Sequence, residues 1–180
     1  MQHTDFSAMS CPVALGLEQV GEWWSILILR DAFYGVTRFE EFRDHLGIAP
    51  NMLTRRLKHL VKAGLLERRR YNDRPPRDEY LLTDRGRDFR TVVLAFFAWG
   101  NRHFAAESKS LLLIDTETGK EVEPVLVDPA TGNVVEGMRY RVLPGPAADA
   151  ATCRRHAKLE QARQRSLQAS AATVAPTAAE

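Results

Sequence analysis

Basic side chains are concentrated in one short part of this 180-residue chain. Between residues 50 and 77, nine Lys and Arg residues stand against only Glu67 and Asp73, a net charge of +7 in a chain whose total is +2. Such a cluster is typical of a protein that binds a polyanion. A solvated helix followed by a solvated loop has the same composition, so charge alone leaves both interpretations open.

Apolar residues within this cluster have the spacing of an amphipathic helix over residues 50–63. Leu53, Leu57 and Leu60 are spaced to form one buried stripe. Polar and cationic side chains then fall on the opposite face, where amide and guanidinium groups could read base edges in a DNA major groove and Lys could reach phosphate. The candidate DNA-binding residues of this face and its flanks are Asn51, Thr54, Arg55, Lys58, His59 and Lys62.

The segments on either side of this helix complete a DNA-binding architecture. Residues 38–46 form a second amphipathic helix, and the short turn 47–49 gives the spacing of a helix-turn-helix. Residues 65–71 and 77–82 are strand candidates, and Asn72 to Pro76 form a turn between them. This hairpin, residues 65–82, would be a wing that rests on the DNA backbone or in a minor groove. The further candidate DNA contacts are Arg38, Arg69, Arg74 and Arg77.

Three more helices are predicted around this motif: residues 12–20, residues 23–34, and a helix capped by Thr83 that runs to about residue 104. The second is apolar almost all round, so we expect it to be buried. The last carries a wide apolar stripe that could be core, line a ligand pocket or form a dimer interface. A dimer is favoured because DNA readers of this size pair to reach two half-sites. The dimer or pocket candidates are Val13, Leu17, Trp23, Trp24, Val93, Phe96, Phe97 and Trp99.

Residues 11–104 resemble the HxlR family of bacterial winged-helix transcription regulators. The resemblance implies a homodimer that dimerises through its first and last helices and regulates nearby genes. One position departs from the family: Ala49 stands where a Ser usually caps the recognition helix, although Pro50 is preorganised for the first turn. The matching stretches are Cys11-Pro12, Gly21-Glu22-Trp23-Trp24, Leu27 to Arg30, Gly35, Arg38-Phe39, Asn51 to Leu57, Leu60, Gly64 to Arg68, Pro75-Pro76-Arg77, Glu79-Tyr80, Leu82-Thr83, Gly86 and Trp99-Gly100.

Cys11 is the candidate sensor residue. It directly precedes a helix start, where amide N–H groups and the helix dipole lower a thiol pKa. The resemblance implies sensing of oxidants or electrophiles through this Cys; the alternative is a small apolar residue that locks the first helix. Cys153 lies in an Ala/Arg-rich tail, and a Cys11–Cys153 disulfide is a further option. Because Cys153-x-x-His156 is only half of a metal pattern, we expect no metal and no cofactor.

The C-terminal third contains a weak repeat of Asp-x-x-Thr-Gly, at residues 115–119 and 128–132. We predict short strands over residues 111–114, 121–127, 134–135 and 139–143, joined by turns in which Gly supplies a positive φ. Similar extensions in some HxlR-like proteins resemble zinc-ribbon knuckles. Here Asp and Thr stand at the Cys positions, which indicates a metal-free descendant. Residues 106–150 carry a net charge of −4, so this extension would repel DNA.

The predicted fold class is α+β, a winged helix-turn-helix domain followed by a small β extension and a flexible or helical tail. The expected divisions are an N-terminal arm (1–10), the winged helix-turn-helix domain (11–107), the degenerate zinc-ribbon-like extension (108–146) and the Ala/Arg-rich tail (147–180). Within the tail, residues 149–170 would form a solvated helix, and the last ten residues would be disordered.

These features predict a dimeric, sequence-specific DNA-binding transcription regulator, modulated through Cys11 or a small ligand. Its partners would be double-stranded DNA, a second copy, and a small-molecule or oxidant effector. The alternative is a protein–protein adaptor that uses a winged helix without specific DNA binding, which the acidic extension favours. An enzyme is not expected, because no nucleophile–base pair, phosphate loop or metal-ligand set is present. No run approaches the roughly 18 apolar residues of a membrane span, and we expect a cytoplasmic protein held at the nucleoid by DNA.

Overall fold

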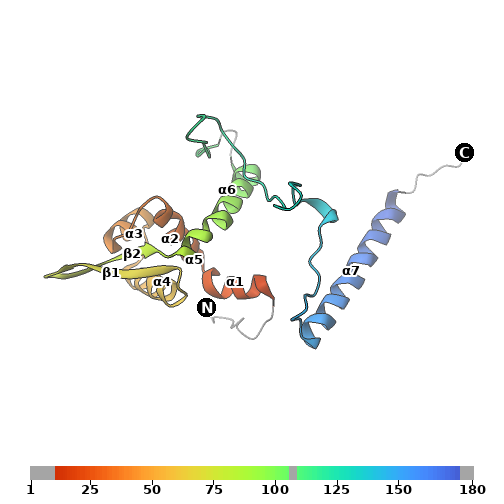
Figure 1. Ribbon diagram of the computed structural model, residues 1–180, viewed down its shortest axis with the longest axis horizontal. Helices are drawn as coiled ribbons and strands as arrows, with labels where there is room; N and C mark the ends of the chain where they lie inside the picture. The colour runs from red at the N-terminus through yellow and green to blue at the C-terminus, as the bar shows by residue number, and fades with distance from the viewer. Residues whose placement is uncertain (1–10, 106–108, 175–180) are drawn as a thin grey trace, which may run out of the picture. The chain divides into compact units, whose positions relative to one another are not determined.

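The computed structural model describes residues 11–105 and 109–174 (Figure 1). The chain divides into two compact units. One unit comprises residues 16–136, and the other comprises residues 1–15 together with 137–180. The expected N-terminal arm (1–10) and the end of the expected disordered tail (175–180) lie outside the described residues.

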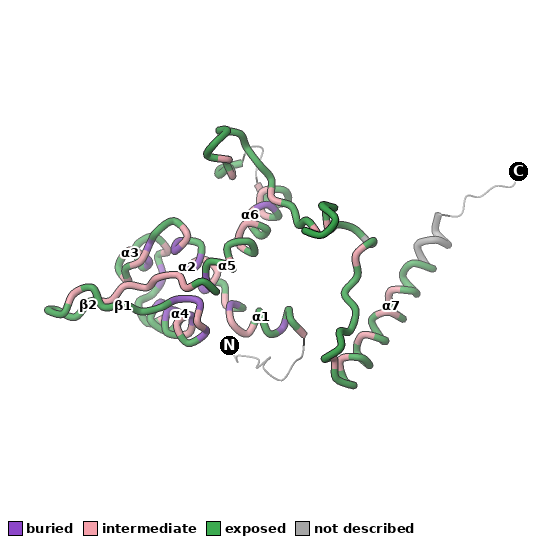
Figure 2. The backbone as a smooth tube through the Cα atoms, viewed as in Figure 1, coloured by how far each residue is buried: buried purple, intermediate pink, exposed green. Residues whose placement is uncertain are grey.

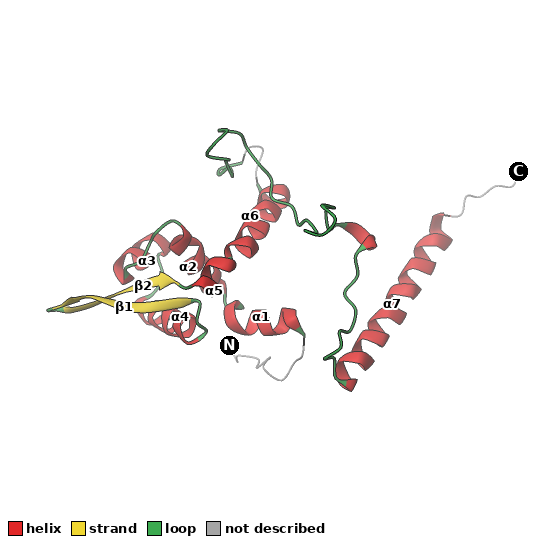
Figure 3. Cartoon of the chain, viewed as in Figure 1, coloured by secondary structure: helices red, strands yellow, loops and turns green. Residues whose placement is uncertain are grey.

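A helix-turn-helix followed by a two-stranded hairpin forms the larger unit (Figure 3). The end of α1 (Pro12–Val20) leads into α2 (Trp23–Phe33), α3 (Phe39–Leu46) and α4 (Pro50–Lys62). Strands β1 (Leu66–Asp73) and β2 (Pro76–Leu82) pair antiparallel and extend beyond the helices, as a wing does. Two further helices, α5 (Asp84–Asp88) and α6 (Arg90–Phe104), follow. The α+β winged-helix prediction is confirmed.

The core of this unit lies where α2, α3, α4 and the base of β1 meet (Figure 2). The stripe of Leu53, Leu57 and Leu60 on α4 is fully buried, as its spacing predicts. The side chains against it come from the neighbouring elements, and burying each contributes roughly 1.5–3 kcal/mol. These partners are Ile28, Leu29, Phe42 and Leu66.

The two helices of the helix-turn-helix are capped differently at their N-termini. At the start of α3, the Glu41 carboxylate accepts the backbone N–H groups of Arg38 (3.0 Å) and Thr37 (3.3 Å), and these hydrogen bonds lower the pKa of Glu41. No side chain caps α4, because Ala49 occupies its N-cap, and Pro50 sits in the first turn instead. Between the helices, Gly47 adopts φ 60°, the left-handed conformation that ends α3 at little cost.

Two helical predictions need correction. The helix predicted from Thr83 to residue 104 is divided at Phe89, where the backbone bonds Phe89 N–H to Gly86 O and Val92 N–H to Phe89 O have the tighter i→i−3 pattern. Phe89 packs against the core at this point. The helix expected to be buried all round also differs, because Trp23 at the start of α2 is 80% exposed.

The extension after α6 is a pair of turns rather than a set of strands. In the described residues of the extension, isolated bridges from Ile114 to Glu121 and from Val127 to Val134 stand where strands were predicted. The predicted last strand, residues 139–143, is absent, and its first residue ends the 3₁₀ helix η1 (Gly137–Arg139). Each bridge closes a turn of the Asp-x-x-Thr-Gly repeat, which is too short for a longer ladder. These strand predictions were therefore wrong, although the repeat marks both turns.

Both turns of the extension have the same hydrogen bonds. Thr118 and Thr131 donate their hydroxyls to Asp115 and Asp128, each at 2.7 Å, and the backbone N–H two residues after each Asp bonds to its other carboxylate oxygen. These bonds hold the pKa of both carboxyls below their usual range. Within the described residues, no group of three His, Cys, Asp or Glu could hold a metal ion.

The smaller unit is built on α7 (Ala150–Val174), which confirms the helix predicted over residues 149–170 and continues to residue 174, into the segment expected to be disordered. The Asp149 carboxylate caps α7 by accepting the Thr152 N–H at 2.7 Å. The segment 141–148 packs along one face of this helix, where His156 bonds to the Val142 carbonyl at 2.7 Å. In the described part of the chain, no helix has the length and apolarity needed to cross a membrane.

Gly86 provides a test of the packing at the base of the wing. A Cβ at this buried position would lie 2.1 Å from the Leu65 carbonyl oxygen, whereas one at Gly145 would meet nothing within 4 Å. We therefore expect Gly86→Ala to lower the free energy of unfolding by about 1–3 kcal/mol. Gly145→Ala, the control, should change it by less than about 0.5 kcal/mol. Urea unfolding measures both, and equal stability of the two variants would contradict this packing.

Candidate nucleic-acid interface

The exposed face of α4 is polar and cationic along its whole length. Burial of the Leu53, Leu57 and Leu60 stripe turns this opposite face to solvent. Nothing on it is acidic, so it presents only hydrogen-bonding groups and positive charge to an approaching surface. The residues predicted to read DNA that are exposed here are Asn51, Thr54, Arg55, Lys58 and Lys62.

Local contacts leave most of these groups available. Thr54 donates its hydroxyl to the Pro50 carbonyl at 2.9 Å, which occupies its proton and leaves its oxygen as an acceptor. Arg55 reaches only the Met52 sulfur, at 3.8 Å. In the described chain, Arg55, Lys58 and Lys62 form no ion pair with a carboxylate.

His59, also predicted to contact DNA, has a partner inside the protein. Its Nε2 lies 2.9 Å from the Gln19 carbonyl oxygen near the end of α1, and the side chain is partly buried. Because Nε2 donates to that carbonyl, only Nδ1 is left for another contact. His59 therefore fastens α4 to α1, and its role in DNA binding stays a prediction.

Arg56 is a positioning residue that sequence reasoning missed. It is 5% exposed and pairs with Glu22, which precedes α2, at 2.9 Å between Nη2 and Oε1. Its Nε is buried with no hydrogen-bond partner among the described residues. A signal was present, because position 56 falls on the same helix face as Leu53, Leu57 and Leu60. With His59, this ion pair fixes α4 against the junction of α1 and α2.

Internal ion pairs neutralise the arginines along the arms of the wing. Arg68 and Arg70 both pair with Asp78 on the opposite strand, the latter at 3.1 Å, and Arg69 pairs with Glu79 at 2.8 Å. Hydrogen bonds from Arg68 and then Arg70 hold the pKa of Asp78 below its usual range. Arg69, a predicted DNA contact, is thus already engaged by a carboxylate.

The tip of the wing keeps its positive charge. Arg74 and Arg77 are exposed, and their guanidinium groups form no ion pair within the described residues. These two predicted contacts therefore lie where cations are free to meet phosphate. The surface formed by the exposed face of α4 and these two arginines is called the cationic surface below.

Arg38 lies beside the wing rather than on α4. Its guanidinium carbon is 4.7 Å from the centre of the Tyr71 ring, a cation–π contact. Tyr71 is left unpaired by a bulge in β1, since Arg70 pairs with Asp78 and Asn72 pairs with Arg77. The predicted DNA contact Arg38 is consequently held against the wing strand.

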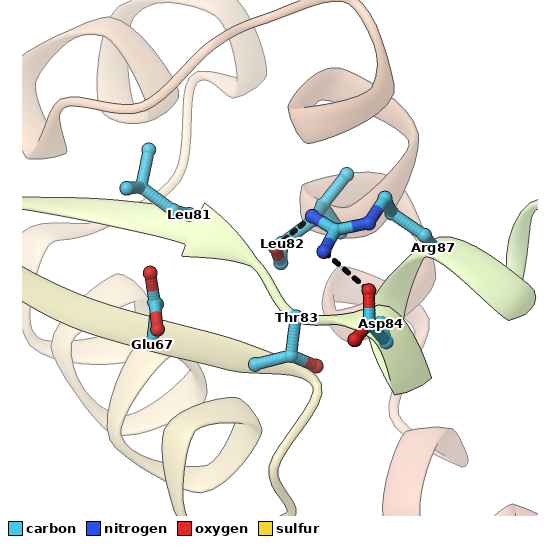
Figure 4. A pocket seen from close by; sticks show the side chains of 6 residues that line it. All are labelled: Glu67, Leu81, Leu82, Thr83, Asp84 and Arg87. Atoms are coloured by element: carbon cyan, nitrogen blue, oxygen red, sulfur yellow. Dashed lines mark hydrogen bonds and ion pairs between the residues drawn. The ribbon is translucent and has the colours of Figure 1, made fainter.

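A shallow hollow of about 450 Å³ marks the base of the wing (Figure 4). Arg87 crosses it, donating to the Leu82 carbonyl and to Asp84, each at 2.6 Å. Beside it, Thr83 donates to the Gly64 carbonyl at 2.6 Å and accepts the Gly86 N–H. Arg87 and Thr83 thus make this hollow a structural joint at the end of β2.

The residues predicted for a dimer or a pocket are largely exposed. On α6, Phe96 is 57% and Trp99 is 48% exposed, and their rings are 5.7 Å apart. Trp99 also contacts Phe104 edge to face at 4.9 Å. Val13 and Leu17 on α1 and Trp23 on α2 are exposed too, whereas Trp24, Val93 and Phe97 are half-buried.

Cys11 directly precedes α1 and belongs to the smaller unit. The backbone N–H groups of Ala14 and Val13, and then the guanidinium of Arg155, lower the pKa of the Cys11 thiol. Cys11 and Cys153 are both free thiols. The sequence anticipated the helix-end effect on Cys11, but not the Arg155 contact.

A helix-turn-helix with a buried leucine stripe, a cationic outer face and an arginine-tipped hairpin defines a winged helix-turn-helix protein. Comparison with known proteins agrees: residues 19–108 match the family model described as HxlR-like helix-turn-helix. The chain belongs to this family and is a transcription regulator, not an enzyme.

Relatives and solved structures carry the same description. An uncharacterized HTH-type transcriptional regulator of Mycobacterium tuberculosis, Rv3095, is 36% identical over 135 residues, which cover 74% of this chain and 85% of the relative. The structure of PA1374 from Pseudomonas aeruginosa, described as a transcription factor by inference, is 51% identical, covers 81% of this chain and 99% of its own, and has a TM-score of 0.61. The structure of PA1607, also described as a transcription factor by inference, is 35% identical to this chain and has a TM-score of 0.71. The match covers 79% of this chain and 100% of PA1607.

The Arg56–Glu22 ion pair generates a stability prediction. Glu22→Gln removes the carboxylate and leaves the buried Arg56 cation without its partner. Breaking a fully buried ion pair costs more, but water already reaches Glu22, whose side chain is 41% exposed. We therefore expect the free energy of unfolding to fall by about 1–3 kcal/mol. The control Glu40→Gln, on an exposed side chain of α3, should cost less than about 0.5 kcal/mol. Urea unfolding measures the free energy of unfolding of both variants. Equal losses in the two would show that the ion pair with Glu22 does not stabilise the buried Arg56.

Proposed function

We propose that this transcription regulator acts as a homodimer that binds a specific DNA sequence through the cationic surface. In this proposal α4 enters the major groove and the wing lies on the backbone or in the minor groove. The observation that carries it is the division of α4 into a fully buried leucine stripe and an exposed face of polar groups and of cations that form no ion pair in the described chain. Direct base readout needs such a face.

The wing supports a division of roles within the cationic surface. Arg74 and Arg77 are free of carboxylates and suit phosphate contacts, which fix register without reading sequence. Arg68, Arg69 and Arg70 are paired with Asp78 and Glu79, and they suit a structural role in the hairpin. In this proposal the DNA also holds the protein at the nucleoid, in the cytoplasm.

Exposed apolar side chains support a dimer. Single exposed apolar residues are common, but Phe96, Trp99 and Phe104 form a continuous aromatic group on α6. A second copy that covers these rings would also supply the second DNA-reading helix that operator binding requires.

Thiol sensing is a second candidate, and the contacts of Cys11 favour it. Two amide N–H groups and Arg155 stabilise the thiolate, which is the form that reacts with oxidants and electrophiles. In this proposal, diamide changes DNA affinity, and Cys11→Ser cancels the change. A protein–protein adaptor remains the alternative reading of the winged helix, with the acidic extension as its support.

Fluorescence anisotropy with the DNA upstream of the chain's own gene, against a scrambled duplex, tests the DNA-binding proposal. We expect Arg55→Ala and Lys58→Ala to weaken selective binding by about tenfold to a hundredfold, with the dimer intact. Arg74→Ala and Arg77→Ala should weaken binding to both duplexes and reduce the salt slope by about one each. The control Lys120→Ala removes an exposed cation of the extension and should change affinity by less than about twofold.

Two results would contradict the proposal in different ways. Undiminished affinity of Arg55→Ala and Lys58→Ala would remove the exposed face of α4 from the interface. Equal, weak binding to both duplexes by the unsubstituted protein would favour the adaptor.

The lowered pKa of Cys11 predicts how the rate of its alkylation depends on pH. In an unfolded chain a Cys thiol has a pKa of about 8.5. A lowered pKa in the folded protein therefore makes more thiolate available below that pH. In a Cys153→Ser background, the rate of iodoacetamide alkylation should reach half its maximum at a lower pH in the folded protein than in urea. A folded midpoint at or above the unfolded one would exclude an activated Cys11.

A further inference from the structure

The smaller unit contains a groove of about 610 Å³ that the proposed DNA-binding surface does not use. Its walls are the start of α1, the segment 141–148 and one face of α7. The Pro144-Gly145-Pro146 sequence keeps 141–148 out of helical or strand structure, so that it runs along α7 as a strap. The volume is in the range of small-molecule sites in proteins.

Apolar surface dominates the walls of this groove. Val142, Leu143 and Leu159 line it and are 88%, 60% and 61% exposed, so three large aliphatic side chains face an open space. Pro144 and Pro146 extend the same wall. A ligand that covered these groups would gain hydrophobic free energy in proportion to the area covered.

The charged residues of the groove leave one cation without a carboxylate. Glu160 is shared between Arg141 and Arg163, each at 3.4 Å, and His156 bonds to the Val142 carbonyl. Arg155 forms no ion pair in the described chain, and it lines the groove together with Cys11, whose thiol pKa it lowers. The lining therefore has three arginines against one glutamate, an excess of positive charge beside an apolar wall.

We propose that this groove binds a small organic carboxylate, whose apolar body covers Leu159 and the strap and whose carboxylate pairs with Arg155. A planar carboxylate matches the guanidinium fork in a bidentate pair, which an alcohol or amide cannot form. Binding of the carboxylate is independent of the proposed function. Its role as the effector of the regulator rests on that function.

A bound carboxylate would compete with Cys11 for Arg155. The thiolate would lose one of the groups that stabilise it, so Cys11 would react more slowly while the ligand is present. Pro12, which lines the groove beside Cys11, is the first residue of α1.

Calorimetric titration of the full chain under reducing conditions tests the site without DNA. The probes are 4-phenylbutyrate and its neutral analogue 4-phenylbutanol. We expect the carboxylate to bind once per chain, and the alcohol to bind at least about tenfold more weakly. Arg155→Gln should abolish this preference, whereas Arg154→Gln, its exposed neighbour outside the lining, should retain it.

The apolar wall has its own matched pair of variants. Leu159→Ser should weaken both probes by a similar factor, and Leu167→Ser, an exposed leucine of α7 outside the groove, should leave both unchanged. Saturating 4-phenylbutyrate should also slow iodoacetamide alkylation of Cys11 in a Cys153→Ser background.

Several outcomes would overturn the site. They are the absence of carboxylate binding, equal binding of both probes, and equal losses in Arg154→Gln and Arg155→Gln. A lower sedimentation mass of Leu159→Ser would assign the groove to a second copy instead, and also overturn it. Because no DNA is present, loss of selective operator binding would defeat the proposed function and leave these results standing.

Discussion

Burial of one leucine stripe is the constraint on which the DNA-reading surface depends. Leu53, Leu57 and Leu60 are inaccessible to solvent, and α4 can bury them in only one rotation about its axis. That rotation turns Asn51, Arg55 and the lysines outward. Arg56 and His59 then bind α4 to the start of α2 and the end of α1. The reading face is thus the geometric consequence of a packed core, made rigid by two polar contacts at its edge.

Ion pairs across the hairpin, rather than the number of arginines, decide where the wing keeps its positive charge. Five arginines lie in the hairpin, but cross-strand carboxylates engage three of them and leave Arg74 and Arg77 at the tip. Cross-strand ion pairs stabilise a two-stranded ribbon that has few apolar contacts of its own. The same carboxylates lower the local positive potential along the arms. The tip, where the two strands end, remains the most cationic part of the wing.

Hydrogen bonds hold the two turns of the extension after α6. In each turn, one Asp carboxylate accepts a Thr hydroxyl and a backbone N–H, and Gly119 or Gly132 closes the turn at positive φ. Such bonds satisfy the turn locally but do not extend a ladder. This explains why single bridges form where strands were expected. The side chains Arg102 and Glu123 tie this extension to the end of α6.

The sequence by itself determined the two helices of the helix-turn-helix, the turn between them, the hairpin and the outward face of α4, because hydrophobic period and turn chemistry are local properties. It also marked Cys11 at a helix start. Only tertiary structure decided that Arg56 and His59 hold α4 rather than face solvent, and that Arg69 is neutralised by Glu79. It alone brought Arg155 to Cys11 across more than a hundred residues. Partners distant in sequence depend on how elements pack, and no spacing rule along the chain encodes that packing.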